Sequence, residues 1–114
     1  MKIKAIKIDV NHMRVSQIEM EYSLAGIHEA VECYVFADVD LPNSFITNQP
    51  HSLLVDDEGA FGNMHLFRID DQFFFGNGVI VGFNPLTSRY IDCTLDCSFV
   101  QSNIAFYTAM GANQ

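Results

Sequence analysis

Four histidines and three cysteines are the side chains of this sequence that most often bind transition metals in proteins. No C-x2-C pair, H-E-x-x-H motif or Cys…His pair at zinc-finger spacing occurs among them. The sequence therefore predicts no metal site and no cofactor. The seven residues are His12, His28, His51, His65, Cys33, Cys93 and Cys97.

Cys93 and Cys97 lie four residues apart, so what they can do depends on the backbone between them. In a strand they would share one face but stand about 13 Å apart, too far for a disulfide or a shared metal ion. In a helix they would lie roughly 6 Å apart, and a metal ion there would need two further ligands. Buried, reduced cysteines account for this spacing better.

Nucleophilic catalysis and phosphate binding have no local motif in this chain. There is no G-x-S-x-G sequence and no local Cys–His or Ser–His pairing, so no catalytic residue is predicted. Gly76 and Gly78 lack the third glycine of a dinucleotide-binding loop, and the predicted strand follows them where such a loop needs a strand before it.

Residues 56–59, with the sequence DDEG, are predicted to form an acidic turn in which Gly59 takes a positive φ. The turn lacks the alternating oxygen ligands of a calcium-binding EF-hand. Beyond it, an amide and an imidazole are placed where they could converge with the carboxylates. One hypothesis is a small-molecule or catalytic site, and the other is a hairpin turn with solvated carboxylates and a surface histidine. The site residues would be Asp56, Asp57, Glu58, Asn63 and His65.

Phe73, Phe74 and Phe75 form a run of three consecutive aromatic residues. In an extended segment successive side chains point to opposite faces, so the three rings cannot all enter one core. We expect at least one ring to face solvent or a partner, and exposed aromatic patches are typical of protein interfaces. The alternative interpretation is a strand that is buried on both faces.

Hydrophobic periodicity predicts the elements that must position these residues. Alternating apolar and charged residues indicate strands over residues 6–10 and 18–22, separated by a turn over residues 11–17. Ser23 suits a helix N-cap, and the helix after it would place Leu24, Ile27 and Val31 on one face, weakened by Gly26.

Further strands are predicted over residues 33–41, 52–55 and 79–83, the last being a buried strand that ends at Asn84 and Pro85. A loop bracketed by prolines separates the first two of these strands. Residues 60–75 show no clear periodicity and receive no assignment. Residues 87–100 fit a strand period and a helix period about equally, so both alternatives stay open.

The chain has 114 residues and 12.8 kDa, of which 49% are hydrophobic and 18% charged, so it should collapse around a core. One domain over residues 1–114 is predicted. The fold class is α+β: a mixed or mostly antiparallel sheet of four to six strands, with one or two short helices packed on one face.

The formal net charge of −8 is unevenly distributed, because residues 1–14 carry +3 and the remaining residues carry −11. Binding to nucleic-acid phosphates or to anionic membranes needs clustered Lys and Arg, so we expect no direct nucleic-acid binding and no membrane binding. No apolar run is long enough to span a bilayer, and an odd number of cysteines fits a reducing compartment. A cytoplasmic location is expected.

The order of elements over residues 18–99 resembles a domain-of-unknown-function family (number 3846) that is found in tailed-phage genomes and bacterial mobile elements. The matching pieces are the cap at Ser23, the turn at residues 57–59, the glycine-flanked strand at residues 76–82, and Leu86 followed by Thr87. The phenylalanine run departs from the family pattern. The resemblance implies an α+β architecture and a phage or mobile-element origin in a bacterial cytoplasm, and it implies no mechanism.

Two functions remain open from the sequence. The first is a non-enzymatic protein-binding module that contacts a second copy of itself or a host protein through the phenylalanine run. The second is a small ligand-binding domain or enzyme with its site around Asn63, His65 and residues 56–58.

Overall fold

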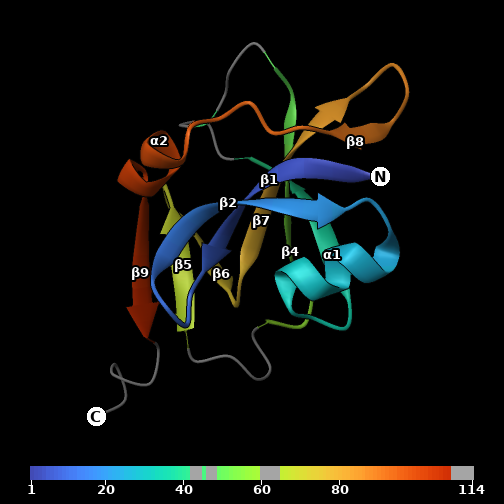
Figure 1. Cartoon of the computed structure of the whole chain (residues 1–114). Coiled ribbons are helices and arrows are strands. Elements are labelled where there is room, and N and C mark those ends of the chain that lie inside the picture. Colours follow the sequence, from blue (N-terminus) through green and yellow to red (C-terminus); the bar gives the residue numbers. More distant parts are fainter. Residues whose placement is uncertain (42–44, 46–48, 60–64, 109–114) are drawn as a thin grey trace.

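The computed structural model describes residues 1–41, 45, 49–59 and 65–108 (Figure 1). Within these residues the chain forms nine strands and two short helices. In chain order the elements are β1 (Lys2–Asp9), β2 (Arg14–Glu21), α1 (Leu24–Val31), β3 (Phe36–Asp40), β4 (His51–Asp56), β5 (His65–Ile69), β6 (Gln72–Phe75), β7 (Gly78–Asn84), β8 (Arg89–Ile91), α2 (Cys97–Ser102) and β9 (Ile104–Thr108).

The strands form two sheets in which every pair is antiparallel. The six-stranded sheet has the order β2-β1-β7-β4-β3, and β8 also pairs with β7. The three-stranded sheet has the order β6-β5-β9. The prediction of a mostly antiparallel α+β fold is confirmed, but it contained one sheet and missed the second.

Two hydrophobic cores lie on opposite faces of the six-stranded sheet. The first core joins this sheet to the three-stranded sheet through residues such as Ile80, Leu53 and Phe67, all fully buried. The second core lies under α1 and includes Val79, Leu54 and other residues of the opposite face. The molecule therefore has three layers: the small sheet, the large sheet and α1.

The two helices cover different faces of the large sheet, which corrects the prediction that they pack on one face. Ile27 and Val31 of α1 enter the second core, whereas Val100 of α2 enters the first. Figure 1 shows α2 beside β9 and α1 on the other side of the molecule. A short helix buries only one apolar stripe, and the two stripes here belong to two different cores.

Strand β1 contributes to both cores, because its buried side changes along its length. Ile3 and Ala5 belong to the core under α1, while Ile6 and Ile8 belong to the core between the sheets. Lys7 shares the face of Ile3 and Ala5, and its ammonium group contacts the Glu32 carboxylate at 2.6 Å. The predicted alternation is confirmed for residues 6–10, but the strand starts four residues earlier.

The β1–β2 hairpin has a shorter turn than the sequence indicates. Asp9 pairs with Arg14, so β2 begins within the segment predicted to be a turn. The Asp9 carboxylate accepts hydrogen bonds from the backbone N–H groups of Asn11 and His12, at 3.1 and 3.2 Å, and Met13 takes a left-handed φ of 49°. These local bonds close the turn within four residues.

Helix α1 begins as predicted, with the Ser23 hydroxyl accepting a hydrogen bond from the Gly26 N–H at 2.9 Å. Leu24 was predicted on the buried face, but it is 68% exposed. Gly26 has a packing role, since a Cβ atom there would lie 2.1 Å from the backbone oxygen of Glu21. The glycine that lowers helix propensity thus allows the helix to approach β2 closely.

The strands predicted at residues 33–41, 52–55 and 79–83 correspond to β3, β4 and β7. Strand β7 is buried on both faces along most of its length, as its continuous apolar sequence indicates. Residues 87–100 contain both predicted alternatives in part, with β8 first and the start of α2 at Cys97. No helix among the described residues is long and apolar enough to cross a membrane.

Candidate protein-binding surface

The phenylalanine run forms strand β6 at one edge of the small sheet. Strands β5 and β6 form a hairpin whose two-residue turn holds Asp70 at a left-handed φ of 54°. Asp tolerates this conformation better than most residues do. The unassigned residues 65–75 are therefore a hairpin, whose pairing places Phe67 opposite Phe74 and Arg68 opposite Phe73.

The rings of the phenylalanine run point to both faces of the small sheet. Phe74 stacks on Phe67 in the core between the sheets, with ring centroids 5.1 Å apart. Phe73 points the other way and is 53% exposed. The expectation that at least one ring faces outward is confirmed, and the alternative of a strand buried on both faces is wrong.

Phe73 belongs to a small cluster that we call the aromatic patch, formed by Arg68, Phe73 and Tyr107. The Arg68 guanidinium carbon lies 6.0 Å from the centroid of the Phe73 ring and 5.6 Å from that of Tyr107. The two rings are 5.8 Å apart, and Tyr107 is 41% exposed. Cation–π contacts at exposed sites typically contribute about 0.5–1 kcal/mol, so they favour this placement of the arginine between the two rings.

The acidic turn and the phenylalanine run meet at one cavity, which the sequence did not predict. A hollow of about 200 Å³ is lined by residues of the end of β4, the turn and β6. Gly59 makes the approach possible, since a Cβ atom there would lie 2.2 Å from the backbone oxygen of Phe75. The lining residues are Val55, Asp56, Asp57, Gly59, Phe73, Phe74 and Phe75.

Two predictions about the acidic turn need correction. The turn does not close a hairpin, because β4 pairs with β3 and β7 while β5 pairs with β6 and β9. It carries the chain from the large sheet toward the small one. Gly59 does not take the predicted positive φ, and its small size is what the close contact with Phe75 requires.

The carboxylates of the acidic turn are not neutralised by any base that the structure describes. Asp56 accepts a hydrogen bond from the Glu58 N–H at 2.9 Å, and the Asp57 N–H donates to the Val35 carbonyl at 2.9 Å. None of the lysines, arginines and histidines in the described part of the chain forms an ion pair with these carboxylates. Their negative charge is therefore available to a group from outside the chain.

Glu58 and His65, which the sequence also placed in the ligand site, do not line this cavity. His65 opens β5, and its Nδ1 lies 3.3 Å from the Thr108 hydroxyl of β9. It is not among the residues that line the cavity beside the acidic turn. Asn63 lies outside the described residues. The convergence of imidazole and carboxylates that the sequence suggested is not present at this cavity.

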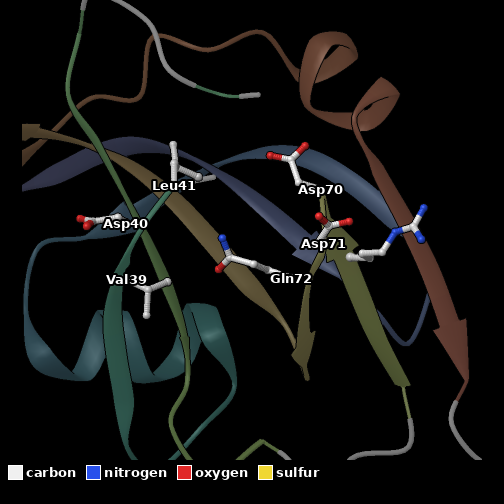
Figure 2. A pocket seen from close by; sticks show the side chains of 7 residues that line it. Val39, Asp40, Leu41, Asp70, Asp71 and Gln72 are labelled. Atoms are coloured by element: carbon white, nitrogen blue, oxygen red, sulfur yellow. The ribbon is translucent and has the colours of Figure 1, made fainter. Parts of the chain in front are cut away.

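A larger hollow, of about 860 Å³, lies at the other end of β6 (Figure 2). Figure 2 shows Asp70 and Asp71 at the β5–β6 turn on one side and Asp40 at the end of β3 on the other, with Gln72 directed between them. Arg68 also lines it, so this hollow adjoins the aromatic patch. Carboxylates thus border the patch at both ends of β6.

The sequence did not place Arg68 and Tyr107 in the candidate surface. Only β5–β9 pairing brings Tyr107 close to Arg68, and these residues are far apart in the chain. The alternation of β5, with Phe67 and Ile69 buried and Arg68 exposed, is the one signal that could have placed the arginine on an outer face.

The three cysteines are free thiols and are half-buried, whereas the sequence predicted buried ones. Burial raises the pKa of Cys33 and of Cys93 to about 11, and for Cys33 the charge of Asp56 adds to the effect. A thiol with a raised pKa stays protonated and is a poor nucleophile. Among the described residues no three His, Cys, Asp or Glu side chains are grouped to hold a metal ion.

The described part of the chain is thus a small antiparallel α+β protein of two sheets. Comparisons with protein-family models, with curated proteins and with solved structures found no match.

Proposed function

We propose that this protein is a non-enzymatic protein-binding module that contacts its partner through the aromatic patch. The observation that carries the proposal is the exposure of Phe73, which is 53% accessible although it lies in a strand with a well-packed opposite face. The partner is a second copy of the chain or a host protein. The resemblance to the phage and mobile-element family, with a bacterial cytoplasm as its setting, is part of this proposal.

The composition of the patch supports protein binding. Aromatic residues and arginine are enriched in protein interfaces, and they dominate the small set of side chains that carry most of the binding energy. Phe73, Arg68 and Tyr107 contact one another, so little side-chain entropy remains to be lost on binding. The carboxylates that border β6 disfavour nucleic acid as the partner.

A small-molecule or catalytic site around residues 56–58 and His65 remains the second candidate, and the geometry favours it less. The cavity beside the acidic turn has about 200 Å³, whereas pockets for drug-sized ligands typically have about 300–1,000 Å³. Its walls also lack His65, the one imidazole proposed for such a site.

Phe73→Ser tests the proposed function, because it removes the exposed ring and leaves Phe74 in the core. Leu86→Ser is the matched control, since Leu86 is 94% exposed in the β7–β8 turn and away from β6. Light scattering and pull-down from a bacterial lysate should show self-association or a captured protein that Phe73→Ser loses and Leu86→Ser keeps. A wild-type chain that stays monomeric and captures nothing would contradict the proposal.

A further inference from the structure

The cavity beside the acidic turn is lined by phenylalanines of β6 and by two carboxylates that form no ion pair with any base in the described part of the chain. We propose that it receives a lysine or arginine side chain from a basic segment of another protein. This inference rests on the proposed function, since it names the chemistry of the partner that the aromatic patch would bind. The cavity and the patch share Phe73, so one partner can contact both.

The size of the cavity indicates a single side chain. Its volume of about 200 Å³ is below the range of pockets that enclose a metabolite or a cofactor. A lysine or arginine has a long apolar stem and a charged end, and such side chains bury the stem against apolar surface while the charge stays near solvent. Val55 and residues of the phenylalanine run supply apolar surface beside the carboxylates, and Asp57 is exposed at the turn.

The charges of the cavity specify a cation. Asp56 and Asp57 line it and form no ion pair with any base in the described part of the chain. An ammonium or guanidinium group bound there would gain charge-assisted hydrogen bonds from the carboxylates and cation–π contact with a phenylalanine ring. An acidic side chain would be repelled by the carboxylates, and a neutral one would gain neither the cation–π contact nor the attraction between opposite charges.

The chain's own bases favour a different protein over a second copy as the source of this cation. Lys7 is already paired with Glu32, Arg68 is held by Phe73 and Tyr107, and Arg89 lies 4.8 Å from the centroid of the Tyr22 ring. Three of the six bases are thus engaged within the molecule. The remaining bases, Lys2, Lys4 and Arg14, all lie in β1 and β2, which are paired within the large sheet and so do not form a separate basic segment that could extend into the cavity.

The test uses the full chain and a hexalysine peptide as the probe, followed by NMR. We expect saturable shifts of the Phe73, Phe75 and Asp57 resonances, which weaken as ionic strength rises. The same peptide with acetylated side chains should produce none, because acetylation removes the charge. Asp56→Asn with Asp57→Asn should weaken hexalysine binding roughly tenfold or more. Asn keeps the oxygen that accepts from the Glu58 N–H, so the turn is retained.

The matched control is Glu19→Gln with Glu29→Gln, which removes the same charge from β2 and α1. Both glutamates are exposed and lie away from the cavity. Equal weakening by the two double variants would mean general attraction to an acidic protein and would overturn the inference. A dimer that Asp56→Asn with Asp57→Asn dissociates would assign the cavity to a second copy and would also overturn it.

The two proposals fail in different ways. Phe73→Ser could abolish capture of a protein while the Asp56→Asn and Asp57→Asn variant retains it at every salt concentration. In that case the proposal that the cavity receives a basic side chain is wrong, and the proposal of a protein-binding module is retained. If Phe73→Ser changes no association and hexalysine causes no shift at Phe73, both proposals are wrong.

Discussion

Asn77 donates a hydrogen bond from its side-chain nitrogen to a carboxylate oxygen of Glu32 at 2.8 Å, which ties the residue before β7 to the C-cap of α1. Lys7 donates to the same oxygen at 2.6 Å. The side-chain oxygen of Asn77 accepts from the Val10 N–H at 3.0 Å, and Asn77 is 5% exposed. One amide thus satisfies a buried backbone group and holds α1 against the sheet.

Asn77→Leu should destabilise the fold by about 1–3 kcal/mol, because a side chain of similar size would leave the Val10 N–H buried without an acceptor. Asn77→Asp should retain that acceptor but place a second carboxylate beside Glu32. Urea unfolding would measure the free energy of unfolding of both variants.

The Asn77→Asp variant should regain stability when Glu32→Gln is added, since a glutamine amide can donate to the new carboxylate. A double variant no more stable than Asn77→Asp alone would show that the Glu32 contact is not what destabilises it.

Gly78→Ala should destabilise the packing of the two sheets. A Cβ atom at position 78 would lie 2.7 Å from Cζ of Phe67 and 3.2 Å from a methyl carbon of Leu53, and both neighbours are fully buried. Overpacking of this kind typically costs about 1–3 kcal/mol. Thermal or urea unfolding should show the loss.

Phe67→Leu provides the control for this contact, because it shortens the ring that the new methyl group meets. The loss for the double variant should be smaller than the sum of the two single losses. Additive losses would mean that Gly78 matters for a reason other than contact with Phe67.

Phe73→Ala and Phe74→Ala should separate binding from stability. Phe74 is half-buried and stacks on Phe67 at the core, so its truncation should cost about 2–3 kcal/mol, below the cost at fully buried phenylalanines. Phe73 is 53% exposed on the outer face, where it contacts Arg68 and Tyr107 and borders the cavity, so its truncation should cost about 1 kcal/mol or less.

Unfolding curves paired with a binding measurement on each variant would test this separation. Equal destabilisation by the two substitutions would argue that Phe73 is a structural residue rather than a binding residue.

His51 should make the fold less stable below neutral pH. Burial lowers the pKa of His51 from its ordinary value of 6.5. Its Nδ1–H donates to the Gln49 carbonyl at 2.7 Å, and Nε2 accepts from the Thr94 N–H at 3.2 Å. The neutral imidazole fits both partners, and protonation at Nε2 removes the acceptor.

Because the folded-state pKa is the lower one, the unfolded chain binds more protons in the window between the two values. This contribution to stability is fully present above pH 6.5 and is lost as the pH falls from there toward the folded-state pKa. Unfolding free energies measured from pH 8 to 5 should show the slope, and His51→Gln should flatten it. A slope unchanged in His51→Gln would assign the dependence to other groups.

The parts of the fold that the sequence predicted are those with a strong local signal. Strand β7 is an apolar run because both of its faces are buried, and α1 begins at Ser23 because a hydroxyl there caps a backbone N–H. The second sheet escaped prediction because β5 and β6 are short and show no clear alternation, and β9 has no strong local signal of its own.

The candidate surface was predicted in part for the same reason. The phenylalanine run is a local feature, and the outward direction of one ring follows from the alternation of a strand. Arg68 and Tyr107 join it only through β5–β9 pairing, which depends on contacts between distant segments. The meeting of the acidic turn with Phe75 likewise depends on the packing of one sheet against the other.

Strand β1 also links the two cores in folding. Its first half belongs to the core under α1 and its second half to the core between the sheets, and the backbone of one strand connects them. Separation of the small sheet exposes Ile6 and Ile8, and this loosens the strand on which Ile3 and Ala5 support α1. We therefore expect one cooperative unfolding transition, with the slowest amide hydrogen exchange in β1, β7 and β4. The three layers of the protein should therefore unfold together in a single transition.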